Sequence, residues 1–130
     1  MRVLIAEHQS KVRFALRVTI ERQPGLKSVS EVVDARELLS HAELMCPDLV
    51  LVDWELPGMD AGETLRSLRR ACPYLFLIAL SGTDEGRLAA LQAGADVSVG
   101  KGDSPDRLLA AIGEYWKREQ QADKKSRAAS

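Results

Sequence analysis

Short apolar runs separated by helical periods constrain the fold of this chain more than any other feature of its sequence. Four runs are dominated by apolar residues, which is typical of strands buried on both faces of a parallel sheet. They are Val3–Ala6, Leu49–Val52, Leu75–Leu80 and the brief Asp96–Val99. A fifth segment, Ser28–Val33, mixes valines with polar residues and is typical of an edge strand.

Between these runs, apolar residues recur every three or four positions, as they do on the buried face of a helix. The stripes, in chain order, are Val12, Leu16 and Ile20; Ala35, Leu38 and Ala42; Leu65, Leu68 and Cys72; Leu88 and Leu91; and Leu108, Ile112 and Tyr115. Strands that alternate with helices at this spacing predict βα units joined by right-handed crossovers. The expected fold class is therefore α/β, a doubly wound (βα)5 domain with a five-stranded parallel sheet.

The two cysteines stand at matching places in a weak internal echo. Cys46-Pro47 and Cys72-Pro73 each end a helical stripe and precede a strand, 26 residues apart. Two cysteines are too few for a disulfide framework, and neither lies in a CxxC motif or a Cys/His cluster. We expect both to be buried, reduced thiols.

The size and charge of the chain limit its partners. Its 130 residues suit one compact domain, and 18 Lys and Arg against 19 Asp and Glu leave a net charge of −1. That balance gives no general attraction to nucleic acid or to an anionic membrane. We place the domain at residues 1–116 and expect residues 117–130, with five basic and two acidic side chains, to be a helix end and polar basic tail or linker.

No apolar run approaches the length that crosses a membrane, and the first run is too short for the core of a signal peptide. The prediction is a cytoplasmic protein with no membrane association and no direct nucleic-acid binding.

Polar residues that follow the predicted strands point to a single site. Ligands of open α/β sheets bind beyond the carboxyl ends of the strands. Glu7 and His8 follow the first strand, Asp53 ends the third, Ser81 follows the fourth and Lys101 follows the fifth. In the expected fold, two carboxylates, an imidazole, a hydroxyl and an ammonium would therefore converge in one cleft.

This set of groups has a coherent reading as a phosphoryl-transfer site. The carboxylate of Asp53 can accept a phosphoryl group directly, and Lys101 would pair with the phosphoryl oxygens. Ser81 would hydrogen-bond another of these oxygens. Glu7 and Asp53 would help to hold Mg²⁺, which prefers oxygen ligands.

With this set of residues, the chain resembles a response-regulator receiver domain over essentially residues 2–116. The resemblance is carried by Arg2-Val3-Leu4-Ile5-Ala6, by Asp48-Leu49-Val50-Leu51-Val52-Asp53-Trp54-Glu55-Leu56-Pro57-Gly58-Met59-Asp60, by Ile78-Ala79-Leu80-Ser81-Gly82, and by Ala93-Gly94-Ala95-Asp96 with Lys101. The segment Gly100-Lys101-Gly102-Asp103, with no proline after the lysine, is similar to receivers of LuxR-type helix-turn-helix regulators.

The resemblance implies a two-component signalling role and the flavodoxin-like strand order 2-1-3-4-5. Asp53 would be the phosphoacceptor for a sensor histidine kinase, with Ser81 and Lys101 registering the phosphate. Mg²⁺ would be the cofactor, and the backbone carbonyl of Glu55 would be one of its ligands. The signal would leave through the face formed by helix 4, strand 5 and helix 5. A homodimer, and an output domain or effector outside this chain, are partners that the resemblance leaves open.

Two positions depart from the family's pattern. His8 stands where the family usually has a second acid, and a neutral imidazole is a poor partner for Mg²⁺ but suits softer transition metals. We therefore expect weak Mg²⁺ binding and slow or absent phosphorylation under ordinary conditions. Ser98 stands where the family usually has an aromatic residue that follows the hydroxyl after the fourth strand.

Three other functions compete with the phosphoacceptor. A pseudo-receiver would share the fold and act by binding a partner without phosphorylation. This alternative stays open because the Glu7 and His8 pair departs from the two acids of a standard receiver. A haloacid-dehalogenase-like phosphatase usually carries its aspartate on the first strand with a second aspartate two residues later, where this chain has Glu55. A flavodoxin-like carrier needs a Ser/Thr-rich phosphate loop after the first strand. We expect a signalling domain that is not an enzyme, beyond removing its own phosphoryl group.

Overall fold

Strands and helices alternate along the whole described chain. The computed structural model describes the backbone of residues 1–129 and the side chains of residues 1–125. The elements are β1 (Arg2–Ala6), α1 (Ser10–Glu21), β2 (Ser28–Val32), α2 (Ala35–Leu44), β3 (Leu49–Asp53), α3 (Ala61–Ala71), β4 (Phe76–Ser81), α4 (Asp84–Gln92), β5 (Val97–Gly100) and α5 (Pro105–Ala129). All five predicted strands are present, and no strand boundary differs from its predicted position by more than one residue.

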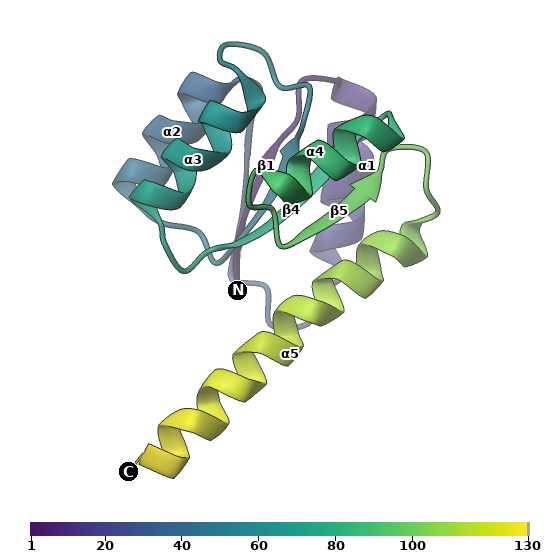
Figure 1. Ribbon diagram of the computed structural model, residues 1–130. Coiled ribbons are helices and arrows are strands. Elements are labelled where there is room, and N and C mark those ends of the chain that lie inside the picture. The colour runs from purple at the N-terminus through teal and green to yellow at the C-terminus, as the bar shows by residue number, and fades with distance from the viewer. Residues whose placement is uncertain (130) are drawn as a thin grey trace.

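The sheet is parallel throughout and has the order β2-β1-β3-β4-β5, as predicted. β2 lies at an edge, which explains its mixed polar and apolar sequence. β3 and β4 are buried along their whole length, and both are apolar at every position except the last, where Asp53 and Ser81 stand. The fold is therefore a doubly wound, flavodoxin-like α/β domain (Figure 1).

Alternate residues of each strand face two separate cores. On one face, Leu4, Val50 and Leu77 pack with apolar residues of α2, α3 and α4. On the other face, Ile5 and Leu51 join a cluster that includes residues of α1 and α5. Because side chains alternate between the faces of a strand, a run that is apolar at every position can fill both layers.

The cysteine prediction is wrong. Cys46 and Cys72 form a disulfide, with their Cα atoms 5.6 Å apart. Cys72 is buried, whereas Cys46 is exposed. The two residues precede the neighbouring strands β3 and β4, so the parallel pairing of these strands brings the cysteines together at the edge of the sheet opposite the predicted site.

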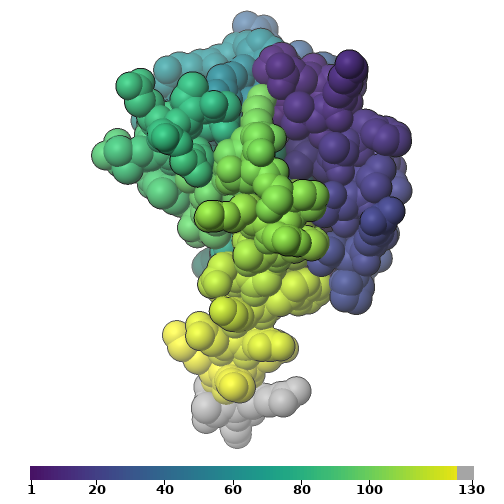
Figure 2. Space-filling view, turned by 90° about the vertical axis from the view of Figure 1, so that its right-hand side faces the viewer, coloured from purple at the N-terminus to yellow at the C-terminus, as the bar shows by residue number. Residues whose placement is uncertain are grey.

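Helix α5 continues well beyond Trp116, where the apolar pattern ends. Arg118 anchors its middle, because Nη2 donates a hydrogen bond to the Tyr74 carbonyl at 2.9 Å and the guanidinium lies 4.9 Å from the centre of the Phe76 ring. Past this contact the helix leaves the body of the domain as a projecting rod (Figures 1 and 2). None of the helices in the described chain is both long and apolar enough to span a bilayer.

Candidate functional site

The carboxyl ends of four neighbouring strands place the predicted site residues at one edge of the sheet. Asp53 ends β3 and Ser81 ends β4, while Glu7 and Lys101 directly follow β1 and β5. Backbone hydrogen bonds extend the sheet through these positions: the Glu7 amide donates to the Val32 carbonyl at 3.1 Å, and the Lys101 amide donates to the Ser81 carbonyl at 2.8 Å. The main chain therefore fixes where each of these side chains begins.

The Lys101 ammonium bridges two buried carboxylates. Its Nζ lies 2.8 Å from Asp53 Oδ1 and 3.1 Å from Glu7 Oε1, and only 13% of the side chain is exposed. Burial lowers the pKa of Lys101, but the hydrogen bonds to Asp53 and Glu7 outweigh burial and raise the pKa above its ordinary value of 10.5. Lys101 therefore holds a permanent positive charge against Asp53.

Asp53 remains ionised although it is buried. Burial raises the pKa of its carboxyl group, but hydrogen bonds from Lys101, from His8 and from the Glu55 amide act in the opposite direction and bring the pKa down to about 2. The Glu55 amide donates to Asp53 Oδ1 at 2.9 Å. At neutral pH this residue is a fixed carboxylate, which is the form that a nucleophile requires.

Glu7, His8 and Asp53 form a group of potential metal ligands. One ligand atom from each lies within 4.8 Å of the others. His8 Nδ1 hydrogen-bonds Asp53 Oδ2 and lies 3.6 Å from Glu7 Oε1. Burial is the main cause that raises the pKa of Glu7, and its second oxygen, Oε2, is buried with no hydrogen-bond partner among the described residues.

The orphaned oxygen of Glu7 and the two buried carboxylates fit a divalent cation, which would supply the missing positive partner. The Glu55 carbonyl, two residues after Asp53, would be the further oxygen ligand that the resemblance to receiver domains implies. His8 changes the character of the set, because its ring nitrogen is a better ligand for transition metals than for Mg²⁺.

The carboxylate of Glu55 is a site group that the sequence analysis missed. Its Oε1 accepts a hydrogen bond from the Ser81 hydroxyl at 3.0 Å and another from the Gly82 amide at 3.1 Å. Among the described residues, the Ser81 hydroxyl donates to Glu55 and makes no hydrogen bond with Asp53. No motif in the sequence signals this contact, because it depends on how the loop after β3 folds over the end of β4.

The loop that carries Glu55 is built by the Leu-Pro-Gly-Met-Asp motif. Gly58 has a φ of 102°, a conformation that residues with a Cβ rarely adopt. The Pro57 carbonyl accepts a hydrogen bond from the Ala35 amide at 2.9 Å, which ties the loop to the start of α2. The Asp60 carboxylate then caps the first turn of α3. Three local constraints thus set the path of the loop.

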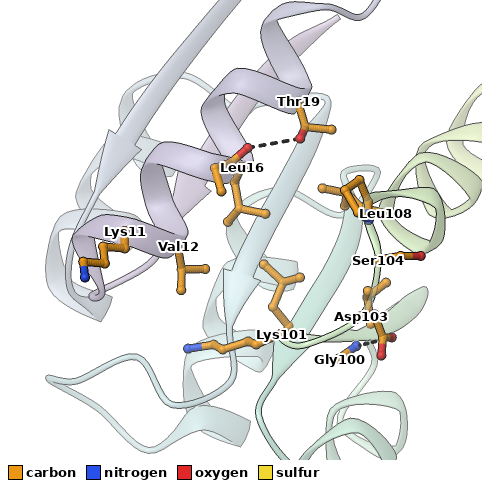
Figure 3. A pocket seen from close by; sticks show the side chains of 13 residues that line it. Lys11, Val12, Leu16, Thr19, Gly100, Lys101, Asp103, Ser104 and Leu108 are labelled. Carbon is orange, nitrogen blue, oxygen red and sulfur yellow. Dashed lines mark hydrogen bonds between the residues drawn. The ribbon is translucent and has the colours of Figure 1, made fainter.

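A groove of ≈ 270 Å³ lies beside the site, between α1 and α5. Figure 3 shows Val12 and Leu16 of α1 lining it together with Leu108 of α5, and Lys101 runs along its lower edge. The Gly100 amide donates to the Asp103 carboxylate at 2.9 Å in the turn that closes one end. Lys101 thus lines this groove while its ammonium reaches Glu7 and Asp53.

Comparisons with known proteins agree on one family. Residues 3–113 match the response regulator receiver domain. The nitrate/nitrite response regulator protein NarL of Escherichia coli K12 is 30% identical over 112 residues, which is 85% of this chain and 52% of NarL. A protein-glutamate methylesterase/protein-glutamine glutaminase of Geobacter sulfurreducens is 34% identical over 98 residues, which is 73% of this chain and 27% of that protein. The chain thus spans about a quarter to a half of the length of these curated relatives.

Solved structures give the same result. A two-component response regulator of the LuxR family from Aurantimonas sp. SI85-9A1 is 30% identical, with a TM-score of 0.78 over 87% of this chain and 82% of that chain. The isolated receiver domain of RcsB from Salmonella enterica has a TM-score of 0.82 over 90% of this chain and 88% of its own, at 24% identity, which supports the fold. This chain belongs to the response regulator receiver domain family, and its neighbours include LuxR-family response regulators.

Proposed function

We propose that this receiver domain accepts a phosphoryl group on Asp53 from a sensor histidine kinase. The observation that carries the proposal is the buried ion pair between the ionised Asp53 carboxylate and Lys101, with Oδ1 and Nζ 2.8 Å apart. A buried carboxylate beside a fixed ammonium provides both a nucleophile and a counter-charge for the incoming phosphoryl oxygens.

Each residue has one task in the transfer. An Asp53 oxygen attacks phosphorus while the bond from phosphorus to the imidazole nitrogen of the donor breaks, and that nitrogen keeps the electron pair. Lys101 moves its hydrogen bonds from the Asp53 carboxylate to the phosphoryl oxygens. Ser81, at the end of the neighbouring strand, donates a hydrogen bond from its hydroxyl group to another of them.

Mg²⁺ is the cofactor of this proposal, with Glu7, Asp53 and the Glu55 carbonyl as its ligands. A bound divalent cation offsets the negative charge shared by the carboxylates and the phosphoryl oxygens. The orphaned Oε2 of Glu7 supports a cation here. His8 in place of a second acid weakens the affinity for Mg²⁺ and favours Mn²⁺ or another transition metal.

The signal would leave through α4, β5 and α5. Phosphorylation puts roughly −1.5 to −2 charges on the phosphoryl group beside Ser81, in place of the single charge of the Asp53 carboxylate, and α4 begins three residues later. Leu88 and Leu91 of α4 and Leu109 of α5 are exposed apolar side chains on this part of the domain. A second copy of the chain, an output domain or a separate effector would read this face. The domain would act as a signalling module, and its only reaction would be the loss of its own phosphoryl group.

Labelling with a small acyl phosphate tests the function directly. We expect the wild type to gain a phosphoryl group in millimolar Mg²⁺ slowly, faster in Mn²⁺, and Asp53→Asn to gain none. Asp106→Asn, which changes an acid in the first turn of α5, is the matched control and should label like the wild type. Failure of the wild type to label with either metal would reject the phosphoacceptor role in favour of a pseudo-receiver.

A further inference from the structure

We propose that the Glu55 carboxylate is a built-in competitor for the phosphoryl group: it occupies the two hydrogen-bond donors, Ser81 and Gly82, that a phosphoryl group on Asp53 would need. This inference deepens the proposed function and rests on it. It assigns Glu55 a side-chain role in addition to that of its carbonyl.

The geometry of the two donors carries the proposal. The Ser81 hydroxyl and the Gly82 amide converge on a single oxygen, Glu55 Oε1, at 3.0 and 3.1 Å. Ser81 is 1% exposed, so its hydroxyl has few alternatives. A carboxylate oxygen and a phosphoryl oxygen are both anionic acceptors, so either one can satisfy this pair of donors but the two must compete for it.

The surroundings hold the Ser81 hydroxyl in the orientation that meets Glu55. The hydroxyl oxygen accepts a hydrogen bond from the Thr83 amide at 3.2 Å, which leaves its proton free to donate. On the other side it abuts Gly86, where a Cβ would lie 2.1 Å from the Ser81 oxygen. The two donors are therefore in place before phosphorylation, and only the acceptor would change, from the Glu55 carboxylate to a phosphoryl oxygen.

Glu55 is able to leave. Its side chain is exposed, and it reaches the donors from a surface loop, whereas Asp53 is held in the sheet. Its backbone amide donates to Asp53 Oδ1 independently of the side chain. Phosphorylation would thus exchange the carboxylate of Glu55 for a phosphoryl oxygen and release Glu55 into solvent beside the start of α4.

The test uses the full 130-residue chain and beryllium fluoride as the phosphoryl mimic, at a Mg²⁺ concentration that saturates the response. We expect Glu55→Ala to lower the half-saturating beryllium fluoride concentration by about threefold to tenfold, because no charge-assisted hydrogen bond has to be broken. Glu55→Gln, which keeps an acceptor oxygen but loses the charge, should fall between Glu55→Ala and the wild type. Glu85→Gln is the control, since it removes an exposed acid in the first turn of α4. Within the described chain, that acid makes no hydrogen bond with Ser81 or Gly82.

The chemical shift of the Gly82 amide proton provides a second readout, which a merely structural role for Glu55 would leave unchanged. In the wild type one anionic acceptor replaces another, so the shift should change little on binding. In Glu55→Ala the amide gains an acceptor that it lacked, so the shift should move strongly downfield.

Binding of equal strength in Glu55→Ala and Glu85→Gln, or equal amide shifts in Glu55→Ala and the wild type, would overturn the competitor role and leave the phosphoacceptor role standing. Absence of binding in every variant would overturn both.

Discussion

His8 gives this pocket its distinct ligand chemistry, because its imidazole hydrogen-bonds the acceptor carboxylate of Asp53 and stands beside Glu7. A His8→Asp variant restores an oxygen ligand and adds a negative charge next to the cation. We expect it to bind Mg²⁺ about tenfold more tightly. The gain in binding free energy behind that factor is only a modest share of the attraction between two unit charges at such a distance. Metal titration by calorimetry measures the change.

His8→Asn is the matched control for this prediction, because it offers an oxygen without the charge and should give a smaller gain. The preference of the wild type for Mn²⁺ over Mg²⁺ should shrink in His8→Asp. Unchanged Mg²⁺ affinity in His8→Asp would show that the imidazole does not limit the site.

Glu7 should destabilise the metal-free fold at neutral pH. Its folded pKa is raised above the ordinary value of 4.5, mainly by burial, so the protonated form is the one that folding favours. Its contribution to stability is fully present below pH 4.5 and is lost as the pH rises through the folded pKa. Glu7→Gln should therefore raise the free energy of unfolding by roughly 1 kcal/mol at pH 7, measured by urea denaturation without metal.

The advantage of Glu7→Gln should disappear at pH 4, where both proteins carry a neutral group. The contribution of Asp53 to stability depends on pH in the opposite direction. Its folded pKa of about 2 lies below the ordinary 3.8, so this contribution is present above pH 3.8 and is lost as the pH falls through 2. A Glu7→Gln variant no more stable than the wild type at pH 7 would contradict the cost assigned to burying this carboxylate.

At the scale of elements, the start of α4 depends on the absence of a side chain at position 86. A Cβ on Gly86 would meet the Ser81 hydroxyl oxygen at 2.1 Å, so Gly86→Ala has to turn that hydroxyl away. We expect loss of the Ser81 hydrogen bond to Glu55 and at least a severalfold weaker response to beryllium fluoride. Crowding should cost about 1–3 kcal/mol, which offsets the better helix propensity of alanine.

Gly113 in α5 provides the control for Gly86→Ala, because a Cβ there would meet no atom within 4 Å. Gly113→Ala should raise the free energy of unfolding by about 0.5–1 kcal/mol, which thermal and urea unfolding would detect. Equal stability and equal beryllium fluoride binding in the two alanine variants would show that position 86 has room for a methyl group.

The elements themselves were largely predictable, because the chain alternates between apolar strands and helical stripes with little ambiguity. The fifth strand shows where the pattern fails. The sequence predicts it at Asp96–Val99, and it lies at Val97–Gly100. The Asp96 amide still donates to the Leu77 carbonyl at 2.9 Å, but the Leu77 amide donates to the Asp96 carboxylate at 2.8 Å, and that carboxylate also pairs with Arg69. These contacts of Asp96 join residues that are distant in sequence, which no local pattern signals.

The site was predictable to the level of which residues end the strands, and no further. Asp53 and Lys101 meet because strand order and register bring them together. The Glu55 carboxylate reaches Ser81 through the path of a loop, which has no periodic signal. The disulfide was missed for a related reason: two cysteines at matching places in an echo become neighbours only once β3 and β4 are known to pair.

For the whole molecule, the disulfide ties the two loops that enter the central strands. It joins residues 26 apart in sequence, and closing a ring of that size in the unfolded chain corresponds to roughly 3 kcal/mol of stability. We expect reductant to lower the free energy of unfolding by about this amount. Urea denaturation of the wild type with and without reductant checks it.

The double variant Cys46→Ala/Cys72→Ala separates the covalent link from other effects of the reductant. Its unfolding curve should be the same with and without reductant, and should lie close to that of the reduced wild type. A wild type that is indifferent to reductant would contradict this stabilising role.

In the projecting part of α5, the number of residues sets the direction in which the end of the helix faces. A helix advances 1.5 Å and rotates by about 100° with each residue, and Arg118 fixes the rotation of α5 where it leaves the body. One residue inserted after Gln120 would swing whatever the helix carries by about 100°, while seven would return it to within about 20° of its original bearing. A partner held by this helix would therefore be sensitive to the phase of the insertion far more than to its length.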